Sequence, residues 1–141
     1  MNRVIALDLG DVRIGIATSD PMGIIAGGHE TYTRTKDLDK DLEYILGLCK
    51  EKECKTIVLG LPLNMDGTSG RRVELVKEFA QALNQKSDIK IDYQDERLST
   101  VSAEKMLISG NVNREKRKKV IDKVAATIIL QSYLDTKGNK F

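Results

Sequence analysis

The sequence predicts an α/β protein in which one mixed five-stranded sheet has helices packed on it. Two observations lead to this class. Short apolar runs typical of buried strands are followed, later in the chain, by longer segments whose apolar residues recur at helical spacing. The length of 141 residues suits a single core, and 40% hydrophobic with 31% charged residues is an ordinary globular balance. We therefore expect one domain over residues 1–141.

The first part of the chain reads as three strands. Residues 4–9 are a short apolar run, which is typical of a strand buried on both faces. Gly10-Asp11 supplies a turn, and residues 12–19 read as a second strand that forms a hairpin with the first. A third strand is expected over about residues 24–33, with a bulge at Gly27-Gly28. These strands are predicted to be antiparallel neighbours.

Helices and strands alternate in the rest of the chain, so the two later strands are expected to run parallel to the first. Capping residues and turn formers mark the element ends. The expected elements are a helix over 37–53, a strand over 56–60, a helix over 73–83, a strand over 89–93, a helix from Ser99 or Thr100 to Gly110, and a helix from Asn113 to about Asp135.

Composition excludes several classes of protein. Cys49 and Cys54 are too few and wrongly spaced for a disulfide framework or a zinc knuckle, so we read them as reduced thiols. No apolar stretch approaches the ~20 residues of a membrane span, and the start of the chain lacks the apolar segment of a secretory signal. We expect a cytoplasmic protein. The net charge of +2 says little about partners, so the distribution of charge matters more.

Three acidic residues are candidates for one site. Asp8 lies near the end of an otherwise apolar strand, where a carboxylate is costly unless it is paired. Glu96 follows the fifth strand, and the carboxyl ends of parallel strands share one edge of a sheet. Asp122 lies at helical spacing from Ala125, Ala126 and Ile129, on a face expected to pack inward. An alternative for Asp8 alone is a structural role, pairing with Arg13 or the adjacent turn.

Clustered carboxylates repel one another unless a cation lies between them. Ligands that are all oxygen favour Mg²⁺ or Mn²⁺ over zinc. The lone histidine, His29, makes a zinc site still less fitting, and we read it as a strand or turn residue. Two such ions ~4 Å apart activate a water and stabilise the leaving oxygen of a phosphodiester. Asp8, Glu96 and Asp122 are therefore predicted as ligands of such a cation.

With these residues in hand, the chain resembles the YqgF family of candidate Holliday-junction resolvases, also described as pre-16S rRNA nucleases. The resemblance covers essentially the whole chain. Its four motifs, in order, are Asp8 to Ala17, Gly60 to Thr68, Asp95 to Thr100 and Asp122 to Gln131. It implies an RNase H-like fold, a catalytic triad on Asp8, Glu96 and Asp122, and a role in trimming the 5′ end of the small-subunit rRNA precursor.

Basic residues near these acids are candidates for nucleic-acid binding. A basic run opens the helix that carries Asp122, and Arg71 and Arg72 open an earlier helix whose backbone N–H groups suit a phosphate. Solvated surface charge is the alternative in both places. Aromatic residues make up only 4% of the chain, which favours backbone and shape readout. The candidates are Arg13, Arg71, Arg72, Arg97, Arg114, Lys116, Arg117, Lys118 and Lys119.

Three other functions compete with an rRNA nuclease. A Holliday-junction resolvase needs a dimer that presents two active sites, and here we expect a monomer or a weak homodimer. A non-catalytic RNA-binding module would gain from losing the acids near phosphate. A phosphate-binding ATPase of the actin and sugar-kinase type begins with a similar Asp-x-Gly turn, but one 141-residue domain cannot enclose a nucleotide that way. Precursor rRNA is the expected partner, with branched DNA as the alternative.

Overall fold

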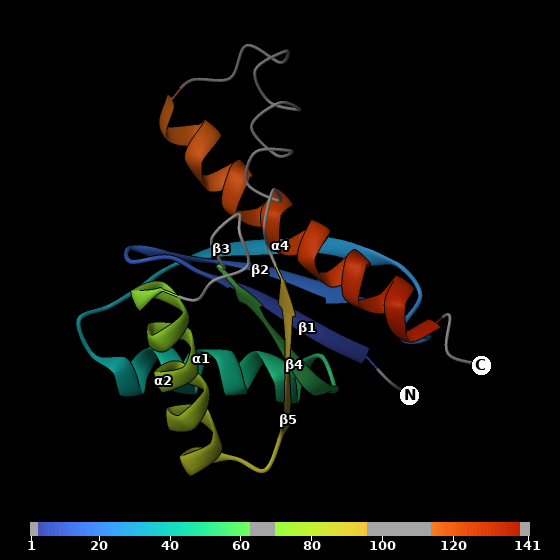
Figure 1. Cartoon of the computed structure of the whole chain (residues 1–141), viewed down its shortest axis with the longest axis horizontal. Helices are drawn as coiled ribbons and strands as arrows, with labels where there is room; N and C mark the ends of the chain where they lie inside the picture. The colour runs from blue at the N-terminus through green and yellow to red at the C-terminus, as the bar shows by residue number, and fades with distance from the viewer. Residues whose placement is uncertain (1–2, 63–69, 96–113, 139–141) are drawn as a thin grey trace.

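The computed structural model describes residues 3–62, 70–95 and 114–138, with side chains of the last segment described over 123–136. The helix expected over 99–110 lies outside this part of the chain. The elements, drawn in Figure 1, are β1 (Arg3–Leu9), β2 (Arg13–Ser19), β3 (Ala26–Thr33), α1 (Leu38–Glu51), β4 (Cys54–Leu61), α2 (Arg71–Lys86), β5 (Lys90–Asp95) and α4 (Arg114–Gly138).

The strands form one five-stranded sheet in the order β3-β2-β1-β4-β5. β1 pairs antiparallel with β2, and β2 pairs antiparallel with β3. A helix precedes each of β4 and β5 in the chain, and both strands run parallel to β1. The predicted mixed sheet, with three antiparallel strands followed by two parallel ones, is therefore confirmed.

β3 contains the expected bulge. Ile16 of β2 pairs with Glu30, and the next residue, Ala17, pairs with Gly28. His29 is thus the extra residue of β3. Its place inside β3 confirms the interpretation of His29 as a strand or turn residue. Its imidazole Nε2 lies 3.4 Å from Glu30 Oε1.

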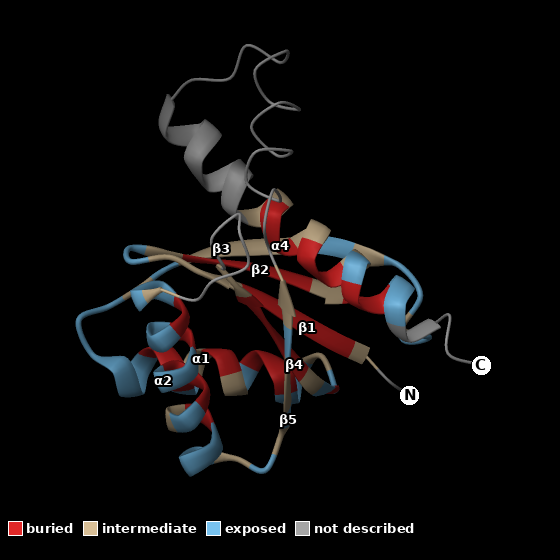
Figure 2. Ribbon diagram, viewed as in Figure 1, coloured by how far each residue is buried: buried red, intermediate tan, exposed pale blue. Residues whose placement is uncertain are grey.

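Each face of the sheet has its own apolar layer, and Figure 2 colours the buried residues red. Successive strand side chains point to opposite faces, so Ile5 and Leu7 of β1 lie on one face, and Val4 and Ala6 on the other. The first face packs against α1 and α2, and the second packs against α4. The α4 layer consists of Val4, Ala6, Ala17, Val58, Ala126, Ile129, Leu130, Tyr133 and Leu134.

Small residues let α4 approach the sheet closely. Ala125 and Ala126 are at most 1% exposed, which confirms that this face of the helix packs inward. At Gly28, a β-carbon would lie 2.8 Å from Cγ of Lys123, so a side chain there would meet α4. Gln131 fixes the helix to the sheet edge, since its Oε1 accepts from Ala26 N at 2.9 Å.

Both cysteines are free thiols and are buried in the α1/α2 layer, as expected. Burial, with a smaller effect from nearby Cys54, raises the pKa of the Cys49 thiol to about 12. Among the described residues, no helix is long and apolar enough to span a membrane.

Candidate active site

Asp8 lies near the carboxyl end of β1, the central strand of the sheet. Its backbone is level with Gly15 of β2, and it is half-buried. Alternation along β1 places Asp8 on the same face as Val4 and Ala6, which is the face covered by α4. The acid predicted from the sequence therefore faces the helix that carries Asp122.

α4 runs antiparallel to β1, and its C-terminal part lies toward the start of β1, where Leu134 and Val4 belong to one apolar cluster (Figure 1). Residues early in α4 consequently lie toward the end of β1 that carries Asp8. The Asp122 position is in the helix one turn before Ala126, whose side chain is fully buried against Ala6 and its neighbours. The side chain of Asp122 and the whole of Glu96 lie outside what the structure describes.

Asp95 ends β5 and is level with Leu61 of β4. Ile91, four residues earlier in the same strand, packs on the α1/α2 layer, so alternation places Asp95 on that face. Asp95 and Asp8 are therefore on opposite faces of the sheet. Arg13 lies four residues before Ala17 in β2, so the two side chains point to the same face. Ala17 belongs to the α4 layer, and Arg13 is therefore on the same face as Asp8.

A tight turn follows Asp8 and needs glycine. The Gly10 amide donates to the Arg13 carbonyl at 2.8 Å. A β-carbon at Gly10 would lie 2.7 Å from that same carbonyl oxygen, closer than real β-carbons approach. The turn that ends the Asp8 strand is thus fixed by its own backbone.

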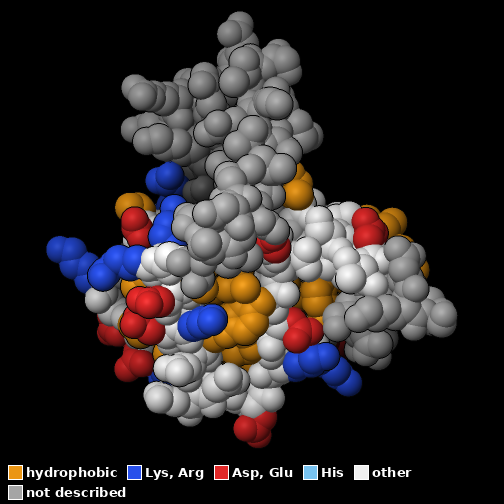
Figure 3. Space-filling view, in the orientation of Figure 1, with side chains coloured by type: hydrophobic (Ala, Val, Ile, Leu, Met, Phe, Trp, Pro, Cys, Tyr) orange, Lys and Arg blue, Asp and Glu red, His pale blue; other side chains and the backbone are white. Residues whose placement is uncertain are grey.

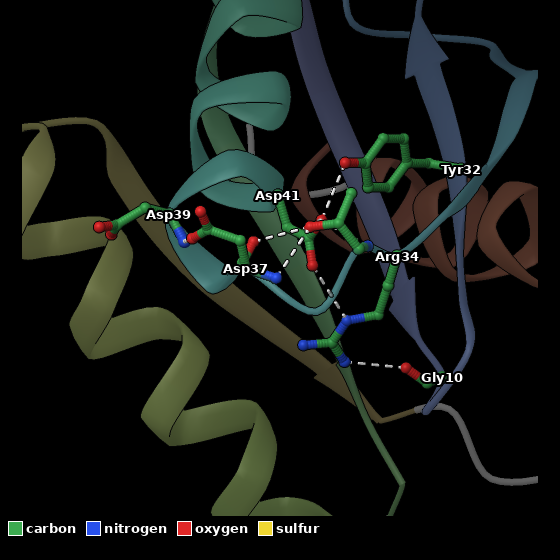
Figure 4. Close-up of polar contacts among 7 residues, drawn as sticks. Gly10, Tyr32, Arg34, Asp37, Asp39 and Asp41 are labelled. Atoms are coloured by element: carbon green, nitrogen blue, oxygen red, sulfur yellow. Dashed lines mark hydrogen bonds and ion pairs between the residues drawn. The ribbon is translucent and has the colours of Figure 1, made fainter.

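Arg34 ties this turn to a buried carboxylate on α1 (Figure 4). Its Nη1 donates to the Gly10 carbonyl at 3.0 Å, and its Nε lies 3.6 Å from Oδ2 of Asp41. The guanidinium also lies over the Phe79 ring, 5.8 Å from its centroid. Arg34 is thereby held on three sides.

Asp41 is only 1% exposed. Its Oδ1 accepts from the Tyr32 hydroxyl at 2.8 Å and the Thr35 amide at 2.9 Å, and the Thr35 hydroxyl lies 3.0 Å from it. Burial acts to raise the pKa of Asp41, but these hydrogen bonds and the Arg34 charge outweigh it and lower the pKa. Asp41 is thus a charged residue at neutral pH.

A pocket of about 330 Å³ lies between the β1–β2 turn, the segment from β3 to α1, and α2. Gly10 and Asp11 line it on the side of the turn, and Arg34 and Arg72 are its basic lining residues. Leu38, Leu75 and Phe79 provide apolar surface. It opens on the α1/α2 side of the sheet.

Sequence reasoning missed Arg34 and Asp41, although a signal was present. Asp41 lies at i+3 from Leu38 and at i−4 from Ile45, on the apolar stripe of its helix. The same argument singled out Asp122. Nothing in the sequence marks Arg34 as its partner, because that contact depends on how the turn after β3 folds back.

The predicted basic residues are placed only in part. Arg71 and Arg72 are exposed in the first turn of α2. The N-cap residue of this helix is Gly70, which has no side chain that could accept a hydrogen bond from the first backbone N–H groups. The basic residues of α4 lie in its first two turns, but their side chains, like all of Arg97, lie outside the described part of the structure. Figure 3 shows described Lys and Arg side chains gathered beside the β1–β2 turn and the start of α2.

A divalent cation fits what is described of the acidic site. Asp8 offers carboxylate oxygen at a half-exposed strand end, the donor type that Mg²⁺ and Mn²⁺ prefer. Within the described residues, no three His, Cys, Asp or Glu side chains come together. Of the three predicted ligands, only Asp8 has a side chain among the described residues. Asp8, Glu96 and Asp122 as a ligand set therefore stay a prediction.

The chain is similar to proteins of known families. A family model described as RuvX, Holliday junction resolvase, matches residues 2–136. A protein from Syntrophomonas wolfei subsp. wolfei, named as a candidate pre-16S rRNA nuclease, is 53% identical over 133 residues, covering 94% of each chain. One from Carboxydothermus hydrogenoformans with the same name is 52% identical, covering 96% of this chain and 98% of its own.

Two solved structures share the fold. Thermus thermophilus RuvC in complex with a Holliday junction substrate has a TM-score of 0.59 at 9% identity, covering 99% of this chain and 97% of its own. The yeast mitochondrial Holliday junction resolvase Ydc2 also has a TM-score of 0.59, at 14% identity, covering 97% of this chain and 79% of its own. The fold is therefore RNase H-like, as expected. Together with the relatives of about half-identical sequence, the family match shows that the chain belongs to the RuvX family.

Proposed function

We propose that the protein is a metal-dependent nuclease that processes the 5′ end of precursor 16S rRNA in the cytoplasm. One observation carries the proposal. Asp8 lies near the carboxyl end of the central strand, on the face packed by α4, in a chain of the RuvX family. The names of the most similar relatives described above support rRNA as the substrate.

Asp8, Glu96 and Asp122 would hold the cation. A cation held there would supply a water of lowered pKa and would stabilise the leaving oxygen of the phosphodiester. Pairing with Gly15 of β2 fixes the backbone of Asp8, and β4 pairs with β1 up to the preceding residue, Leu7, so little reorganisation of this acid is needed during the reaction. Arg13 on the same face, and the basic first turns of α4, would bind phosphates on either side of the scissile bond.

A Holliday-junction resolvase is the second candidate, because the matching family model carries that description. The chemistry at the acids would be the same. The two functions differ in substrate and in the need for paired active sites, since a resolvase cuts two strands. Dimerisation on a four-way junction would therefore favour this candidate over an rRNA nuclease.

The test is a cleavage assay with pure full-length protein and Mn²⁺. Labelled precursor rRNA, single-stranded RNA and a four-way DNA junction are compared at equal concentration. We expect cleavage of the precursor at a defined 5′ position and slower cleavage of the other two. Preferential, symmetric cutting of the junction would replace the first candidate by the second.

Variants then assign the acids. Asp8→Asn keeps the shape but loses the charge, so single-turnover cleavage should fall ~10³-fold or more. Glu96→Gln and Asp122→Asn should fall comparably, and double variants should be far from additive because the acids act as one unit. Asp95→Asn is the matched control, because that acid lies on the opposite face of the sheet and should have a mild effect. Full activity in all four variants would overturn the proposal.

A further inference from the structure

We infer that the pocket beside the β1–β2 turn is a subsite for one unpaired nucleotide of the nucleic-acid substrate, on the face of the sheet opposite to Asp8. The inference rests on the proposed nuclease function and goes beyond it, since the only contacts predicted on this side of the sheet are phosphate contacts at Arg71 and Arg72. The pocket volume of about 330 Å³ is at the small end of ligand sites, which suits a single nucleoside rather than a longer segment.

The location connects the pocket to the candidate active site. Gly10 and Asp11 line it, and they follow the Asp8 strand directly. Arg34 joins the two physically, because it lines the pocket while its Nη1 donates to the Gly10 carbonyl at 3.0 Å. The pocket therefore lies at the end of the Asp8 strand, on the face of the sheet opposite to the Asp8 side chain.

The walls suit a flat heteroaromatic ring. Leu38 and Leu75 line the pocket and are large apolar side chains that nonetheless remain 44% and 41% exposed. Below them Val76 and Phe79 are almost fully buried, which gives the pocket an apolar base. A nucleobase that leaves its stack can bury apolar surface against such walls, which contributes ~25 cal/mol per Å².

Arg34 supplies a preorganised polar surface among these walls. The contacts with Gly10, Asp41 and Phe79 hold the guanidinium plane in place before any ligand arrives. Bases stack on guanidinium planes in the recognition of unpaired RNA, and a fixed plane loses little entropy on binding. The buried, charged Asp41 is what keeps this arginine in position.

The charged residues at the rim complete a nucleotide site. Arg72 lines the pocket from the first turn of α2, where a phosphate is favoured by both the charge and the helix N-terminus. Asp11 and Glu78 line it as well and offer acceptors for the N–H groups of a base or for ribose hydroxyls. Cations alone would indicate only an anion site, whereas donors, acceptors and apolar walls together fit a nucleotide.

The first experiment measures binding without cleavage. The full chain is titrated with AMP and, separately, with ribose 5-phosphate, and backbone amide shifts are followed by NMR. We expect AMP to shift the amides of Gly10, Leu75 and Phe79, and ribose 5-phosphate to bind at least ~10-fold more weakly because it lacks the base. Equal affinity for the two ligands, or AMP shifts confined to other residues, would overturn the inference.

Leu38→Ser and Leu75→Ser remove the walls at exposed positions, so neither should disturb folding. Each should weaken AMP binding by about 5- to 10-fold, since one apolar contact of this size is lost. Ile25→Ser is the matched control, because Ile25 is 65% exposed on the β2–β3 connection and does not line the pocket. An equal loss of affinity in all three variants would contradict a specific subsite.

The second experiment connects the pocket to cleavage. The labelled substrate is prepared with an abasic sugar at each position near the cut in turn. We expect one position at which the missing base raises KM ~10-fold with kcat unchanged, and at which Leu75→Ser has no further effect. Uniform KM at every position, with cleavage intact, overturns the subsite alone. AMP binding in the pocket without cleavage of any nucleic acid overturns the nuclease proposal and supports the nucleotide site.

Discussion

Asp8 and Asp41 are acids on otherwise apolar stretches, and their surroundings differ. Asp41 is 1% exposed, and its Oδ1 accepts hydrogen bonds from Tyr32 and Thr35. Asp8 is half-buried near the end of its strand, with a turn directly after it. A carboxylate buried among donors stabilises the fold, whereas a carboxylate with partial access to solvent can be reached by a cation. The first description fits Asp41, and the second fits the role proposed for Asp8.

Asp41→Asn should lower the free energy of unfolding by about 1–3 kcal/mol, since it leaves buried donors and the Arg34 charge without their anionic partner. Urea unfolding at pH 7 measures the change. Asp39→Asn is the control from the same helix turn, because Asp39 is 72% exposed and pairs only with Lys86 among the contacts described. Its loss should stay within about 0.5 kcal/mol. Equal destabilisation of the two variants would contradict a structural role specific to Asp41.

The same carboxylate should shape the acid limb of the stability curve. The folded state lowers the pKa of Asp41, so its contribution is present above the unfolded pKa and is lost as pH falls through the lower folded value. Unfolding free energies measured between pH 6 and pH 2.5 should therefore converge for wild type and Asp41→Asn in acid. A difference that stays constant over this range would show that the charge of Asp41 is not what stabilises the fold.

At the scale of elements, the approach of α4 to β3 depends on Gly28. Gly28→Ala places a β-carbon 2.8 Å from Lys123 Cγ and 3.3 Å from Thr127 Oγ1, so the lysine must change its conformation or the helix must shift. We expect destabilisation of about 1 kcal/mol or more from this overpacking, measured by urea unfolding. Gly27→Ala is the neighbouring control, with only the Thr18 carbonyl oxygen at 3.9 Å. It should be neutral or slightly stabilising. A larger loss at Gly27 than at Gly28 would contradict this packing.

The first two turns of α4 carry the predicted nucleic-acid contact. Reversing the charge of Arg117, Lys118 and Lys119 should weaken RNA affinity and flatten its dependence on salt, because fewer counterions are released on binding. Single-turnover cleavage at saturating protein should survive, which separates binding from chemistry. Unchanged affinity at low salt would identify these residues as ordinary solvated surface.

Much of this architecture is readable from local sequence. The apolar runs of β1 and β4 and the helical stripe of α1 specify buried elements by period alone, and Gly27-Gly28 indicated the bulge. The choice of His29 as the extra residue depends on the pairing of two strands, which no single segment encodes. Likewise the Arg34–Asp41 pair and the pocket beside it arise from the way a loop folds back over α2. Of the predicted acids, the structure describes Asp8 and the backbone of Asp122.

At the scale of the whole molecule, cation binding should be coupled to folding. Asp8, Glu96 and Asp122 come from distant parts of the chain, so a cation that holds them together stabilises the folded state over the unfolded one. At a concentration ~100 times its dissociation constant the gain is ~2.7 kcal/mol, which raises Tm by several degrees. A thermal scan with and without Mn²⁺ measures it. The Asp8→Asn, Asp122→Asn double variant should show no such shift and should equal or exceed wild type in stability without metal. A shift of equal size in that variant would refute a site on these acids.

α4 also has a consequence for the order of events during protein synthesis. Val4, Ala6, Ala17 and Val58 are covered by residues that are translated more than sixty positions after the last of them. A chain still emerging from the ribosome can therefore form the α1/α2 side of the sheet, while the other side stays bare. Asp122 arrives with the same late helix. The proposed acidic site can therefore be complete only after the last helix has been synthesised.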